Sequence, residues 1–150
     1  MPTYILRYSN LKFTKKQKLK IAKGITNTHK EVTGANTYFA QVIFYQNSKN
    51  SHYMGGKVVN SKEIFLNGQI RGGRSKKVKK NLIYKLRLNL IKEIKIKKDN
   101  LWIYLEDLPP NQMIEYGEIL PKSGKERSWF NSLPRNLKKR LSKIERNNEN

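Results

Sequence analysis

The sequence contains no cysteine, which excludes disulfide bonds, thiolate metal ligands and cysteine nucleophiles. A cysteine-free chain suits a reducing compartment, and we expect a cytoplasmic location. No window approaches about 18 consecutive apolar residues, and the N-terminal segment MPTYILRYSNLKF lacks the long apolar core of a secretory signal. The sequence therefore predicts neither export nor a membrane-spanning segment.

Acidic residues are also scarce: 11 Asp and Glu stand against 32 Lys and Arg, which gives a formal net charge of +21. Such an excess is typical of nucleic-acid-binding proteins, but here it extends over both halves of the chain and forms no separate basic arm. Lysine accompanied by many asparagines and isoleucines also arises from compositional drift without any such partner. We favour drift, and a nucleic-acid partner stays open at this point.

The apolar content is high enough for a folded domain. Of the 150 residues, 37% are hydrophobic and 10% aromatic, which is too much apolar material for a disordered chain. A chain of this length can bury a sizeable core, so we expect a compact soluble protein.

The first half of the chain has the pattern of a β-α-β unit. Residues 3–8 (TYILRY) predict a strand, and Thr14 is a typical N-cap for the helix that follows. The helix should end near Thr33-Gly34, before the strand formers of residues 38–45 (YFAQVIFY). Apolar residues at helical spacing line this helix, at Leu19, Ala22, Ile25 and Val32.

The second half repeats this pattern. Residues 63–70 predict a strand, residues 71–74 (RGGR) a turn, and Ser75 the N-cap of a second helix. A strand over residues 101–105 (LWIYL) follows, closed by Asp107 and the pair Pro109-Pro110. The apolar stripe of the second helix comprises Val78, Leu82, Leu86, Leu90 and Ile94.

The two units have the spacing of an internal duplication. Thr14 and Ser75 are 61 residues apart, and Ile43 and Ile103 are 60 apart. The predicted fold class is α/β (α+β): two fused β-α-β units that form a mainly parallel four-stranded sheet with both helices on one face. The other face would need a cover, which oligomerisation could supply.

These patterns predict one domain over residues 1–132. Its first unit covers about residues 1–60, with a connector of hairpin character at 45–62, and its second unit covers about 61–121. Residues 122–150 are expected to be irregular and basic, with an aromatic anchor at Trp129-Phe130, and residues 133–150 to form a basic tail with a mobile end.

A few residues have types that can carry chemistry. Pro2 becomes a secondary amine at the chain end if the initiator Met is removed, although, taken alone, it is more typical of an ordinary second residue. Arg71 and Arg74 flank two glycines at a strand-to-helix turn, where backbone amides already favour an anion such as a small carboxylate. A solvated turn is the alternative interpretation.

Three further residues are ambiguous on their own. His29 lies on the apolar stripe of the first helix and, taken alone, is typical of a core histidine. Tyr104 is typical of a strand core or of a cross-strand pair, and Glu115 of a surface charge. Two histidines and no cysteine give no support to a metal site, and the chain has neither a Walker-type phosphate loop nor a nucleophile elbow.

Taken together, these residues resemble the tautomerase superfamily, and within it the cis-3-chloroacrylic acid dehalogenase branch. The resemblance extends over about residues 1–132. It is carried by the segments MPTY, ITNTH, AQVIF, YMGG, GRS, LWIYL, LPPNQMIEYGEILP and WF. It implies catalytic roles for Pro2, His29, Tyr104 and Glu115, substrate binding by Arg71 and Arg74, a homotrimer, and no metal or organic cofactor.

The resemblance also implies a reaction. Water would add to a small 2,3-unsaturated carboxylate, either 3-halogenated or acetylenic, with Pro2 as proton donor, and malonate semialdehyde would form. Family members with the same residues prefer acetylenic acids and sometimes decarboxylate the product, so the physiological substrate stays open. The alternatives are a keto-enol tautomerase with Pro2 as general base and a basic nucleic-acid-binding protein on this scaffold. This chain departs from the branch in its charge and in its tail after Lys122.

Overall fold

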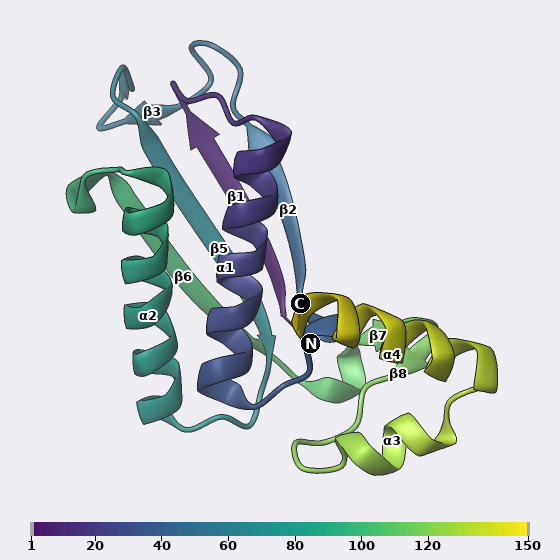
Figure 1. Ribbon diagram of the computed structural model, residues 1–150. Coiled ribbons are helices and arrows are strands. Elements are labelled where there is room, and N and C mark those ends of the chain that lie inside the picture. The colour runs from purple at the N-terminus through teal and green to yellow at the C-terminus, as the bar shows by residue number, and fades with distance from the viewer. Residues whose placement is uncertain (1, 150) are drawn as a thin grey trace.

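A four-stranded sheet with two long helices on one face forms most of the computed structural model, which describes residues 2–149 (Figure 1). The sheet order is β2-β1-β5-β6. Two small hairpins, three 3-10 turns and two C-terminal helices complete the fold. The elements are β1 (Thr3–Ser9), α1 (Lys15–Thr33), η1 (Thr37–Phe39), β2 (Gln41–Gln46), β3 (Tyr53–Met54), β4 (Lys57–Val58), β5 (Glu63–Arg71), α2 (Lys76–Ile94), η2 (Lys98–Asn100), β6 (Leu101–Leu108), η3 (Pro110–Gln112), β7 (Ile114–Glu115), β8 (Glu118–Ile119), α3 (Glu126–Ser132) and α4 (Arg135–Glu149).

Strand pairing confirms the predicted mainly parallel sheet. β1 pairs with β2 in parallel, and β5 pairs with β6 in parallel, as a β-α-β crossover requires. The two units meet at the centre of the sheet, where β1 and β5 are antiparallel and Leu6 lies opposite Leu66. The start of β1 therefore lies beside the end of β5.

Local hydrogen bonds explain where the helices begin and end. The Thr14 side chain accepts a hydrogen bond from the Gln17 backbone N–H, and the Gln17 side chain accepts one from the Thr14 backbone, which completes a capping box. Gly34 ends α1 in the left-handed conformation, with φ of 71°. Ser75 caps α2 in the same way, by accepting from the Val78 backbone N–H. All three predicted boundaries are confirmed.

The main core lies between the sheet and the two helices. Alternate residues of the central strands point toward the helices and are fully buried, as Tyr4 and Leu66 are. The predicted stripe of α2 is confirmed at Leu82, Leu86 and Leu90, which are completely buried. In α1 the expected Leu19 is 59% exposed, and Ile21 takes the core position instead.

The opposite face of the sheet carries large exposed side chains. Tyr45, Trp102 and Tyr104 are each about half exposed there. Strand parity is the reason, because these residues alternate with the core-facing residues of β2 and β6. No helix of residues 2–149 covers this face in Figure 1, and none of the helices in that range is long and apolar enough to span a membrane.

Two predicted strand boundaries are wrong. The second strand was expected from residue 38, but Tyr38 and Phe39 form the 3-10 turn η1, and β2 begins at Gln41. Both rings are buried in a second apolar cluster at the end of the sheet, and this packing outweighs their strand propensity. β6 extends beyond the expected residue 105 to Leu108, whereas the expected hairpin between residues 45 and 62 is present as β3–β4.

The expected irregular tail is also wrong, because residues 126–132 and 135–149 are helical. α3 and α4 build the second cluster, which contains Phe39, Trp129, Leu133 and Leu141. The apolar residues Leu137, Leu141 and Ile144 recur at helical spacing among lysines and arginines. The separation of residues 1–132 from a tail stays a prediction.

Replacing Leu141 by Ala tests how firmly α4 belongs to the fold. Leu141 is fully buried, so truncation should lower the free energy of unfolding by about 2–5 kcal/mol. The exposed neighbour Lys143, replaced by Ala, should change it by less than about 0.5 kcal/mol. Urea denaturation measures both. Equal effects of the two substitutions would contradict an integral α4.

Candidate active site

The antiparallel centre of the sheet brings the start of β1 to the end of β5. Thr3 lies opposite Gln69, so Pro2 lies beside the last residues of β5. Pro2 is buried, and its carbonyl accepts a hydrogen bond from the Gln41 backbone N–H at 2.9 Å. Helix α4 and the β7–β8 hairpin lie at the same end of the molecule (Figure 1). Pro2 is therefore surrounded by protein rather than exposed to solvent.

Arg71, the last residue of β5, is only 2% exposed. Its Nη1 donates to the Pro121 carbonyl at 2.8 Å, and its Nη2 forms an ion pair with Glu126 at the start of α3. The Arg71 Nε has no partner within residues 2–149. The guanidinium is thus held from two sides by the segment between β8 and α3.

The two glycines after Arg71 are required by the turn. The Gly72 backbone N–H donates to the Leu108 carbonyl at 2.8 Å, and a Cβ at this position would lie 3.3 Å from that oxygen. Gly73 has φ of 102°, which L side chains rarely adopt. This tight turn lets the Arg74 Nη1 donate to the Arg71 carbonyl at 2.5 Å. The two arginines are therefore neighbours.

Arg74 is partly buried next to a second cation. Burial lowers its pKa, and the positive charge of Arg71 lowers it further. The negative charges of Glu126 and Asp107 act in the opposite direction. This end of the sheet is therefore a site of concentrated positive charge, suited to a small anion.

His29, from the last turns of α1, is buried close enough to Arg74 to interact with its charge. The Tyr4 hydroxyl is 2.7 Å from its Nδ1. Burial lowers the pKa of His29 to about 3, and the charge of Arg74 contributes. Burial likewise raises the pKa of Tyr4, so both groups are neutral near pH 7. When the phenol donates to Nδ1, the proton of the imidazole is on Nε2, which has no partner in the described part of the chain.

Glu115 and the two arginines line neighbouring cavities. A cavity of about 630 Å³ is lined by Glu115, Thr3 and Gln41, among others. A second cavity, of about 380 Å³, is lined by Arg71 and Arg74. Phe39 lines both cavities. In the single chain, the predicted carboxylate and the predicted anion-binding pair thus line different cavities, which share Phe39 as a lining residue.

Tyr104 is not brought to the other predicted residues. It lies on the edge strand β6, 53% exposed, on the sheet face opposite His29. Its ring packs edge-on against Phe65 at 5.1 Å between centroids. Within one chain, five of the six predicted residues belong to one end of the sheet, whereas Tyr104 belongs to the open face.

Two residues that contact the predicted site residues, Glu126 and Tyr4, were not predicted from the sequence. Glu126, the partner of Arg71, belongs to a segment that was expected to be irregular. Tyr4, the partner of His29, has a readable signal in its alternation with Leu6 and Tyr8, which places it on the helix-facing side of β1. Among residues 2–149, no group of three or more His, Asp or Glu side chains could hold a metal ion.

Comparisons with known proteins identify relatives of this fold. A family model, Tautomerase_3, described as an oxalocrotonate tautomerase enzyme, matches residues 1–132. The crystal structure of N1, a member of the cis-3-chloroacrylic acid dehalogenase family, is 26% identical with a TM-score of 0.89, and the match covers 94% of this chain and 99% of that one. The symmetric trimer of wild-type fused 4-OT named Q0 is 16% identical with a TM-score of 0.71, over 79% and 94% of the chains, and shows the fold alone. No curated protein sequence matches the chain.

The neutral state of His29 makes stability depend on pH. The unfolded chain protonates this residue near pH 6.5, whereas the folded chain does so near pH 3, so the unfolded state binds more protons between these values. The stability contributed by neutral His29 is present above pH 6.5 and falls as the pH drops toward 3. At pH 5 the loss should be on the order of 2 kcal/mol.

Urea denaturation at pH 7.5 and pH 5 measures this loss, with His29→Gln as the comparison. Protonation of carboxylates lowers the free energy of unfolding of both proteins at pH 5. Only the parent should also lose the contribution of neutral His29. An identical pH dependence of the two proteins would contradict a neutral buried His29.

Proposed function

Because the chain belongs to the tautomerase superfamily, in the branch of the cis-3-chloroacrylic acid dehalogenases, we propose that it is a cofactor-independent hydratase or dehalogenase of small 2,3-unsaturated carboxylates. The observation that carries the proposal is the position of buried Pro2 beside the end of β5, where Arg71 and Arg74 concentrate positive charge. An anionic substrate held there would lie close to the amino end of the chain. The proposed substrates are 3-halogenated and acetylenic three-carbon acids.

In this proposal the arginines bind and activate the substrate. Arg71 and Arg74 hold the carboxylate and draw electron density away from the β-carbon, which is electrostatic catalysis by preplaced cations. Glu115 then activates a water molecule for attack at that carbon. His29 is neutral and contributes hydrogen bonding rather than charge.

Pro2 completes the addition as a secondary ammonium. The hydroxyl group bonds to the β-carbon, and Pro2 gives its proton to the α-carbon. With a 3-halogenated acid, the resulting halohydrin expels halide and a proton and leaves malonate semialdehyde. No step needs a metal or an organic cofactor.

A keto-enol tautomerase is the second candidate, with Pro2 as general base. The two arginines favour it, because neighbouring positive charge lowers the pKa of an amine and makes it a better base near neutral pH. Glu115 and the arginines line different cavities, which also fits a reaction that needs no activated water. The two candidates differ in whether Glu115 is required.

A homotrimer is part of the same proposal. The sheet face with Tyr45, Trp102 and Tyr104 exposes aromatic surface that a second subunit could cover. A fused 4-OT structure of the same fold is described as a trimer. Because Tyr104 lies on the face opposite His29, it would contribute to catalysis from a neighbouring subunit.

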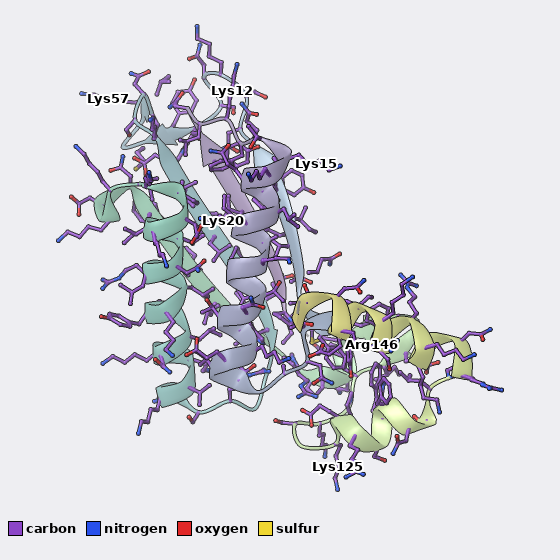
Figure 2. The ribbon with its side chains drawn as sticks, in the orientation of Figure 1. Lys12, Lys15, Lys20, Lys57, Lys125 and Arg146 are labelled. Atoms are coloured by element: carbon purple, nitrogen blue, oxygen red, sulfur yellow. The ribbon has the colours of Figure 1, made fainter. Side chains whose placement is uncertain are left out.

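The net charge of +21 fits substrate capture better than a nucleic-acid site. In Figure 2 the labelled Lys12, Lys15, Lys57 and Lys125 project outward from different parts of the molecule. Charge spread in this way raises the local concentration of any small anion. It gives no observation in favour of a nucleic-acid-binding groove, so this alternative is not adopted.

Replacing Pro2 by Ala tests the hydratase. After removal of Met1, checked by mass spectrometry, this variant has a primary amine in place of the ring nitrogen. Turnover of cis-3-chloroacrylate or propiolate should fall at least about 100-fold, because a positioned acid contributes about that much. Proton NMR detects malonate semialdehyde or acetaldehyde. Parent-like turnover by the variant would contradict a role for Pro2.

The substitution Glu115→Gln distinguishes the hydratase from the tautomerase. Glu118→Gln is the matched control, because Glu118 is an exposed carboxylate on the same hairpin. Hydration should fail in the Glu115 variant and persist in the control. If Glu115→Gln leaves phenylenolpyruvate ketonisation intact and the parent hydrates none of the acids, the tautomerase replaces the hydratase.

Sedimentation and subunit mixing test the trimer. The parent should sediment as three chains, and a monomer would contradict the proposal. Pro2→Ala and Tyr104→Phe should each be poorly active alone. Mixed after unfolding and joint refolding, they should regain activity, because some sites then combine an intact Pro2 with an intact Tyr104. Absence of any gain would place Tyr104 outside the reaction or in its own chain's site.

A further inference from the structure

The contact between Arg71 and Glu126 lies inside the cavity that also contains Arg74. Glu126 begins α3 and is 34% exposed, whereas the guanidinium that it meets is buried. A carboxylate of the protein therefore already forms an ion pair with Arg71, one of the two cations that are proposed to bind a substrate carboxylate.

Geometry fixes Arg71 at several points. Its backbone belongs to β5, in register with Leu108 of β6. Its Nη1 donates to the Pro121 carbonyl and its Nη2 to Glu126. Contacts at both Nη atoms restrict rotation of the guanidinium, and the Glu126 contact is the one of the two that carries charge. Charge-assisted hydrogen bonds of this kind are stronger than neutral ones.

The carboxylate is ionised in this position. Burial alone would raise the pKa of Glu126, but hydrogen bonds from Arg71 and from the backbone N–H groups of Glu126 and Gly124 lower it below the usual value. Glu126 therefore compensates one of two adjacent positive charges. Without it, Arg71 and Arg74 would face an incoming anion with their full combined charge.

We propose that Glu126 is a positioning residue, which holds the Arg71 guanidinium in one orientation and limits the ground-state attraction of the site for carboxylates. The inference rests on the proposed function in that the anion bound by Arg71 and Arg74 is the substrate. Its two effects have opposite signs: removal of the Glu126 charge should strengthen anion binding and weaken turnover. A structural role alone would lower turnover without tightening binding.

Glu126→Gln is the main test, because it removes the charge and keeps the shape. Propionate, which has no double bond to hydrate, serves as the probe, and its dissociation constant is measured by NMR titration. The variant should bind propionate about threefold or more tightly, since a competing carboxylate is gone. Its kcat for the unsaturated acid that the parent turns over best should fall about tenfold.

A second readout follows Arg71 directly and needs no activity. Nitrogen-detected NMR of the guanidinium groups, with the Arg71 signal assigned by its loss in Arg71→Lys, reports rotation about the Nε–Cζ bond. Rotation should be slow in the parent and faster in Glu126→Gln. Glu126→Asp keeps the charge on a shorter side chain, so it should bind propionate like the parent while Arg71 rotates faster.

Asp99→Asn is the matched control, because it removes one exposed carboxylate from η2 and should leave all three readouts unchanged. Unchanged or weaker propionate binding by Glu126→Gln would overturn the inference, and so would unchanged Arg71 rotation. If the parent turns over none of the unsaturated acids, the proposed function fails, and the propionate and arginine measurements still decide the role of Glu126.

Discussion

The antiparallel pairing of β1 with β5 is the constraint on which the site depends. It runs from Thr3 opposite Gln69 to Ser9 opposite Glu63, and so it places the start of the first strand of one unit beside the end of the first strand of the other. A parallel pairing of the same strands would separate Pro2 from Arg71 by the length of the strand, roughly 23 Å for seven residues. Pro2 lies beside the end of β5, where the two arginines are, only because the first strands of the two β-α-β units pair antiparallel.

Local patterns predicted the elements whose boundaries are set locally. Thr14, Ser75 and Gly34 each act through hydrogen bonds within a few residues, so the helix boundaries were readable. The start of β2 was not readable, because Glu145 of α4 accepts hydrogen bonds from the Thr37 and Tyr38 backbone N–H groups and fixes the 3-10 turn there. These contacts span more than 100 residues of sequence. The same distance in sequence concealed α4, whose apolar residues are buried in the second cluster, to which that turn contributes Tyr38 and Phe39.

The candidate site follows the same division. The Arg-Gly-Gly-Arg turn was predictable, because glycine at positions 72 and 73 is required by the local backbone geometry. The neutral state of His29 and the hold of Glu126 on Arg71 arise from burial and from a helix that the sequence did not reveal. Tyr104 lies between these cases. Its alternation with the core-facing residues of β6 was visible in the sequence, and this parity alone places it on the open face.

The duplicated scaffold offers two equivalent ends, and its residues make them chemically different. An offset of 61 residues relates Thr14 to Ser75, η1 to η2, and the hairpin β3–β4 to β7–β8. At the opposite end of the sheet, the residue equivalent to Arg71 by this offset is Asn10, and its side chain donates hydrogen bonds to the carbonyls of Val59 and Ser61.

The residue equivalent to His29 by the same offset is Leu90, which is fully buried. Burying an imidazole needs a partner such as the Tyr4 hydroxyl, whereas burying leucine needs none. The imidazole is buried at the end where, in the proposed function, Arg71 and Arg74 bind an anion. In that proposal the function depends on a few residues that differ between equivalent positions rather than on the fold itself.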